Sequence, residues 1–149
     1  MPFSPVRAAR ETAGAAASPR RRVGHRARLC RVPADWYPHR RSDGEVVGWI
    51  VPDADGFRAV DLLGRTVGSS PVDWLEAEAL LEDRGIGYLA DRYRLRMPDG
   101  SERPVRIAEA SGEGITVVAD EFGMASAVGA AHERFRLPFP APEDLQPRP

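Results

Sequence analysis

The chain has 149 residues and a formal net charge of −1, a length that suits one domain of ordinary size or two very small ones. No apolar run is long enough to form a transmembrane helix, and the N-terminus lacks the apolar core of a secretory signal. The single cysteine, Cys30, excludes an internal disulfide. We therefore expect a cytoplasmic protein with no membrane partner.

Arginine supplies all 21 of the residues counted as lysine or arginine, because the sequence contains no lysine. It also contains no asparagine and a single glutamine, Gln146. Lysine is normally among the commonest residues, and it shares A-rich codons with asparagine. Their joint absence indicates a coding sequence biased to G and C, as in a high-G+C bacterium. The number of arginines is therefore weak evidence for nucleic-acid binding, and only their positions carry information.

The N-terminal part is basic and the remainder is acidic. Residues 1–41 carry ten arginines against two acidic residues, and residues 42–149 carry eleven against twenty, which gives formal charges of +8 and −9. Residues 11–19, ETAGAAASP, show neither helical nor strand periodicity. A segment of this composition cannot bury enough apolar surface to offset its ordering entropy. We predict that residues 1–34 form a disordered basic tail.

Three explanations of this tail remain open. It is an arm that binds nucleic acid through phosphates, an organellar transit peptide, or upstream sequence that follows a start codon placed too early. The last is preferred, and the lysine-free composition, which looks bacterial, argues against the transit peptide. An arm would use the clustered arginines Arg20, Arg21, Arg22, Arg26 and Arg28.

A single globular domain is predicted over residues 35–140, and it begins with a hairpin at 45–67. Trp36 and Tyr37 are expected to pack at the edge of its core. Residues 45–51, EVVGWIV, form a continuous apolar run bounded by turn residues, which indicates a buried strand. The following turn, 52–56, ends in Asp-Gly, and residues 57–67 supply the second strand with a break at Gly64.

The only helix is predicted over residues 71–84. Ser69 or Ser70 is a suitable N-cap, Pro71 suits the first turn, and Gly85 is a natural C-terminal stop. Two apolar stripes lie on nearly opposite sides of this helix, so we expect it to pack between the hairpin and the strands that follow. The stripes are Trp74, Ala77 and Leu81, and Val72, Leu75 and Ala79.

Residues 92–139 read as an antiparallel meander. Strands are predicted over 92–97, 104–110, 115–119 and 133–139, because short alternating or β-branched runs are separated by turns. Residues 122–131 form a loop or short helix, and the Pro-rich residues 141–149 form an extended tail. The fold class is therefore α+β and β-rich, with an N-terminal hairpin and one helix packed on a small meander or a partly open SH3-like barrel. The predicted core is Trp49, Leu75, Leu81, Leu95, Ile107, Val117, Phe135 and Leu137.

No motif in the sequence predicts a catalytic residue, a metal site or a cofactor. The segment 53–56 is not a calcium-binding loop, since Leu62 stands where the pattern needs a glutamate. The spacing of His25, Cys30 and His39 matches no zinc site. A pairing of Ser126 with His132 is possible along the chain, but a loop serine and a solvated histidine are the preferred interpretation.

Arginines alternate with apolar residues on three of the predicted meander strands, so their side chains point away from the core on one sheet surface. Arginine is suited to bidentate contacts with phosphate or carboxylate groups. Nearby acids (Glu102, Glu109, Glu113, Glu121 and Glu133) favour a salt-bridged, solvated surface, with anion binding as the alternative. The arginines are Arg92, Arg94, Arg96, Arg106, Arg134 and Arg136.

These patterns favour a non-catalytic binding or accessory module. Its expected partner is a protein, with nucleic acid as a second possibility through the arginine surface or the basic tail. The alternative is a small enzyme or enzyme subunit, with a pocket between the helix at 71–84 and the meander that uses the 122–132 loop.

Overall fold

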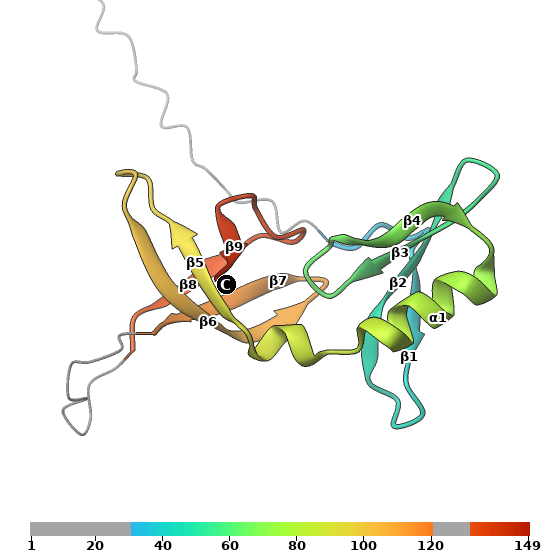
Figure 1. Cartoon of the computed structure of the whole chain (residues 1–149), viewed down its shortest axis with the longest axis horizontal. Helices are drawn as coiled ribbons and strands as arrows, with labels where there is room; N and C mark the ends of the chain where they lie inside the picture. The colour runs from blue at the N-terminus through green and yellow to red at the C-terminus, as the bar shows by residue number, and fades with distance from the viewer. Residues whose placement is uncertain (1–30, 121–131) are drawn as a thin grey trace, which may run out of the picture.

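The computed structural model describes residues 31–120 and 132–149, which form two antiparallel sheets and one α-helix (Figure 1). This confirms the α+β, β-rich fold class. The first sheet has the order β1-β2-β3-β4 and the second the order β8-β7-β6-β5-β9. The first sheet comprises β1 (Tyr37–Arg40), β2 (Val46–Asp53), β3 (Gly56–Asp61) and β4 (Thr66–Val72). Helix α1 (Trp74–Arg84) and the 3-10 helix η1 (Gly87–Ala90) follow. The second sheet comprises β5 (Arg92–Arg96), β6 (Glu102–Ser111), β7 (Gly114–Ala119), β8 (Arg134–Leu137) and β9 (Leu145–Pro147).

The predicted hairpin is present as β2 and β3, in which Asp53 pairs with Gly56 across the turn. Gly64 turns the chain with a φ of 77°, a value that favours glycine. The chain then returns as β4, a strand that extends to Val72 and pairs with Phe57 of β3. The hairpin is therefore the centre of a four-stranded sheet.

Helix α1 begins later than predicted. Its N-cap is Asp73, whose carboxylate accepts a hydrogen bond from the Glu76 N–H at 2.8 Å. The predicted cap residues, Ser69 and Ser70, belong to β4, a strand that pairs with β3 on either side of them, at Val67 and at Val72. Gly85 ends the helix as expected, with its N–H bonded to the Leu81 carbonyl.

One stripe of α1 packs on the first sheet. Ala77 and Leu81 are fully buried there, and Gly48 makes room for Leu81, because a Cβ at Gly48 would lie 2.7 Å from the leucine Cδ2. The predicted core position Leu75 is wrong, since 75% of its surface is exposed. The main contacts of α1 are with β2, β3 and β4 (Figure 1). The buried residues of the first sheet that pack with the second sheet form a cluster separate from those that pack with α1.

The second sheet contains the predicted meander, with turns at Pro98–Gly100 and after Ser111. The predicted loop at 122–131 lies outside the described residues, apart from its neighbour His132. Regular structure does not end at the proline tract, as the sequence suggested. Strand β9 pairs with β5, and Leu145 opposite Leu95 is fully buried.

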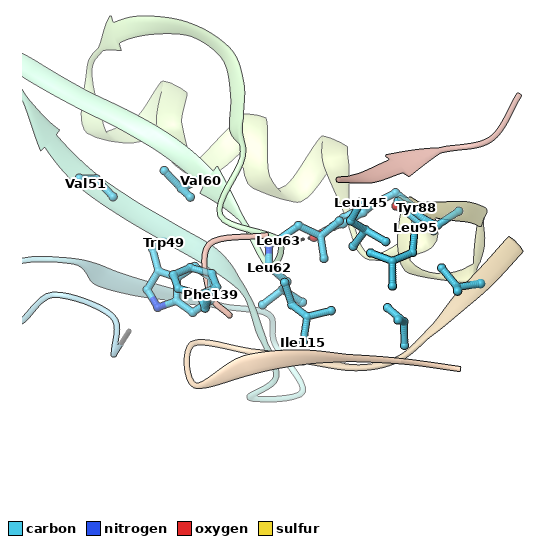
Figure 2. Close-up of a cluster of buried hydrophobic side chains, with 13 residues drawn as sticks. Trp49, Val51, Val60, Leu62, Leu63, Tyr88, Leu95, Ile115, Phe139 and Leu145 are labelled. Atoms are coloured by element: carbon cyan, nitrogen blue, oxygen red, sulfur yellow. Dashed lines mark hydrogen bonds between the residues drawn. The ribbon is translucent and has the colours of Figure 1, made fainter. Parts of the chain in front are cut away.

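The principal core lies between the sheets (Figure 2). The Trp49 ring packs against Phe139 with their centroids 5.0 Å apart, and Leu145 packs beside Leu95 and Leu63. Of the remaining predicted core residues, Trp49, Leu81, Leu95 and Val117 are buried, whereas Ile107, Phe135 and Leu137 are half-buried.

Residues 31–34, which were predicted to belong to the disordered tail, lie within the described part of the chain. Val32 packs against the core, and the Trp36 N–H bonds to the Pro33 carbonyl at 3.1 Å. The predicted disordered tail otherwise lies at residues 1–30, outside the described part of the chain.

A buried polar cluster joins the sheets at the turn after β3. The Asp61 carboxylate accepts hydrogen bonds from the Leu63 and Arg65 N–H groups at 2.9 and 3.0 Å. The Tyr88 hydroxyl accepts the Leu62 N–H at 2.9 Å, and the Tyr93 hydroxyl donates to the Tyr88 carbonyl at 2.8 Å. Burial raises the pKa of Tyr88 well above its ordinary value, so its hydroxyl stays protonated.

Replacing Leu145 with alanine should lower the free energy of unfolding by about 2–5 kcal/mol, because it leaves a cavity in the core between the sheets. The matched change Leu75→Ala, on the exposed side of α1, should alter stability by no more than about 0.5 kcal/mol. Urea denaturation of the two variants measures both values. Similar effects at the two positions would contradict the burial of β9 against β5.

Tyr88→Phe should cost about 1–3 kcal/mol, because the buried Leu62 N–H loses its acceptor. The wild-type protein should also lose stability as the pH rises above about 10, since the unfolded-state tyrosine then ionises while the buried one does not. Urea titrations between neutral and alkaline pH should show a shallower loss for Tyr88→Phe. An unchanged slope would mean that Tyr88 is solvated.

Candidate partner-binding surface

All six predicted arginines are exposed on the surface of the second sheet that faces away from the core. The strand alternation is regular, since Tyr93 and Leu95 are buried between exposed arginines on β5. The pairing register places Arg92 opposite Arg106, Arg106 opposite Val118, and Val118 opposite Arg134. One row of side chains therefore crosses four strands. We call this surface the arginine face, made up of Arg92, Arg94, Arg96, Arg106, Arg134, Arg136 and Arg148.

Arg148 belongs to the arginine face but was not found by sequence reasoning. Its N–H bonds to the Arg92 carbonyl at 2.7 Å, which continues the pairing of β9 with β5. Arg148 also lines a shallow depression together with Arg94 and Glu102. The proline-rich composition of this segment predicted a tail, and only the isolated apolar Leu145 signals that it returns to the sheet.

Carboxylates neutralise part of the arginine face. Glu102 lies 3.7 Å from Arg94 and 4.0 Å from Arg96, and Asp120 lies 3.1 Å from the Arg106 Nε. Exposed pairs of this kind contribute little to stability. Of the acids expected to pair there, Glu133 instead contacts Arg103, and the Asp120 pair was not anticipated.

Arg134 and Arg136 are two neighbouring members of the arginine face that no carboxylate neutralises within the described residues. Both are exposed on β8, and within residues 31–120 and 132–149 neither makes an ion pair. Their cross-strand neighbours on β7 are Val118 and Thr116, which carry no charge. Two neighbouring cations without a paired carboxylate give this end of the face a local positive potential.

One cleft among the described residues, of about 860 Å³, does not lie where the enzyme hypothesis placed a pocket. It lies between β1, β2 and η1 on one side and the β6–β7 turn on the other, with Trp49 and Leu62 in its lining. No residue of α1 lines it, and it contains no histidine or cysteine. Ser126, the proposed partner of His132, lies outside the described residues.

The described part of the chain contains no group of three histidine, cysteine, aspartate or glutamate side chains that is arranged to hold a metal ion. In the same residues no helix is long and apolar enough to cross a membrane. Comparison with protein-family models, curated proteins and solved structures gives no match to this chain. Its function is therefore inferred from its own residues.

Proposed function

We propose that this chain is a non-catalytic binding module that contacts an acidic surface of a protein partner through the arginine face. The observation that supports this is the gathering of seven guanidinium groups on one sheet surface of a chain whose net charge is −1. A local positive field of this kind attracts an anionic partner and fixes its orientation. Arginine is also enriched at protein interfaces, because its planar fork binds carboxylates bidentately.

A protein partner fits this face better than a nucleic acid does. Glu102, Glu109 and Asp120 lie among the arginines on the same surface, and these carboxylates repel an unbroken row of phosphates. The aromatic residues of β5 and β8, Tyr93 and Phe135, point toward the core, so they cannot stack on bases. A protein surface that carries both signs of charge can match both kinds of group.

Reversing the charge of Arg134 and Arg136 in the full chain should weaken binding of poly-glutamate by about tenfold at low salt, because two unpaired cations become anions. Raising the salt should weaken binding to the wild type as well. Fluorescence anisotropy with labelled poly-glutamate, and in parallel with mixed-sequence DNA, measures these affinities. DNA binding that exceeds poly-glutamate binding and depends on the same residues would favour nucleic acid over protein.

The matched control replaces Arg31 and Arg41 with glutamate, which changes the net charge equally at exposed positions away from the arginine face. This control should retain most of the poly-glutamate affinity. Equal losses in the two variants would show that the basic N-terminal part binds the probe and that the arginine face does not.

Glu102→Gln should act in the opposite direction. It removes the carboxylate that lies within 4.0 Å of both Arg94 and Arg96, so two more guanidinium groups become available to an acidic partner. We expect poly-glutamate to bind about two- to fivefold more tightly, with the free energy of unfolding changed by no more than about 0.5 kcal/mol. A weaker affinity in the same anisotropy assay would contradict a role for this part of the face.

A further inference from the structure

Among the described residues, the outer edge of β8 has no backbone partner at Arg134 and Arg136, whose side chains also make no ion pair there. β8 is the end strand of its sheet and pairs only with β7 among the described residues. The Ala119 N–H bonds to the Glu133 carbonyl at 2.9 Å. Along an antiparallel strand, the N–H and C=O groups of every second residue point to the same side. Because the Glu133 carbonyl faces β7, the backbone groups of Phe135 and Leu137 face β7 as well. Those of Arg134 and Arg136 therefore face outward, away from the sheet.

The side chains at this edge present a charged side and an apolar side. Arg134 and Arg136 are exposed on the arginine face. Phe135 and Leu137 are half-buried on the opposite face, where they pack at the margin of the core between the sheets. A strand added beside β8 would place successive side chains alternately next to the arginines and next to these apolar groups.

We propose that the β8 edge binds an extended segment of the partner as an added strand, and that this segment alternates acidic and apolar residues. Its backbone would pair with the N–H and C=O groups of Arg134 and Arg136, as in other cases of strand addition. Its acidic side chains would lie beside the two guanidinium groups, and its apolar side chains would cover Phe135 and Leu137. This inference rests on the proposed function, since it specifies which part of an acidic partner docks and where.

The charge of the edge selects this occupant over a second copy of the chain. Two β8 edges brought together would set arginine against arginine, and like charges directly opposite each other are destabilising. Pro138 follows the strand and has no N–H to donate. The docking strand is therefore short, about four residues, and depends on its charges as well as on backbone pairing.

Amide hydrogen exchange of the full-length protein, followed by NMR, tests the inference directly. The probe is a capped peptide of repeated Glu-Val dipeptides. In the free protein, Arg134 and Arg136 should exchange fast while Phe135 and Leu137 are protected by β7. Saturating peptide should slow exchange at Arg134 and Arg136 by at least about tenfold, through new hydrogen bonds. Protection of these two amides in the free protein would show that the edge is already occupied and would overturn the proposal.

Control peptides separate strand addition from simple charge attraction. A peptide of the same composition with all valines before all glutamates should bind at least about fivefold more weakly, as should a Glu-Val peptide N-methylated on the edge that would face β8. Arg134→Glu with Arg136→Glu should lose the Glu-Val peptide and bind a Lys-Val peptide instead. Arg31→Glu with Arg41→Glu, an equal charge change at exposed positions away from the arginine face, should retain Glu-Val binding.

The outcomes distinguish this inference from the function on which it rests. If poly-glutamate binds through the arginine face but the Glu-Val peptide gives no protection at Arg134 and Arg136, partner binding stands and strand addition is overturned. If binding is indifferent to N-methylation and to residue order, strand addition is likewise overturned. If neither probe binds at low salt, both proposals fall together.

Discussion

The turn between β3 and β4 depends on one buried carboxylate, and the relation between the two sheets depends on that turn. Asp61 is only 1% exposed, and its carboxylate accepts hydrogen bonds from the backbone N–H groups of Leu63 and Arg65. Its hydrogen bonds shape the turn from which Leu62 and Leu63 enter the core between the sheets. The Tyr88 hydroxyl accepts a hydrogen bond from the Leu62 N–H, which holds the backbone of this turn against η1. Because β5 begins shortly after Tyr88, this cluster also positions the strand that carries the first residues of the arginine face.

The arginine face could be predicted because strand alternation leaves no choice where one side of a sheet is buried. In Arg92–Arg96, a shift of one residue would bury three guanidinium groups and expose Tyr93 and Leu95, at a large cost in desolvation. The sequence did not indicate β9, because proline is normally a poor strand residue. At a sheet edge the outward-facing position needs no N–H donor, so the lack of an N–H at Pro147 does not prevent pairing there. The isolated Leu145 then supplies the apolar contact that holds the strand.

The packing of α1 could not be predicted from periodicity, because it is set by contacts that are distant in sequence. Leu75 belongs to a well-formed apolar stripe, yet it is exposed, since the second sheet packs with buried residues of the first sheet that are separate from those that pack with α1. The helix start was predicted too early for a similar reason. Ser70 and Asp73 are both good caps, and the pairing of Val72 with Phe57 in β4 decided between them. In both cases tertiary pairing overrides a local preference that was itself reasonable.

Codon bias accounts for arginine in place of lysine, but it does not account for where the arginines lie. Charged residues on a short edge strand protect a sheet against edge-to-edge pairing with its own copies, and Arg134, Arg136 and the following Pro138 meet that description. The same charges do not oppose an acidic strand. Under the proposed function, the same two arginines would both discourage pairing with a second copy of the chain and favour an acidic partner strand. Neutralising carboxylates are found around Arg94, Arg96 and Arg106, where the backbone is already paired within the sheet. Within the described residues, no such carboxylate pairs with Arg134 or Arg136 of β8, and the backbone groups of these two residues have no strand partner. The combination of an unpaired backbone and an unpaired charge distinguishes the β8 edge from the rest of the face.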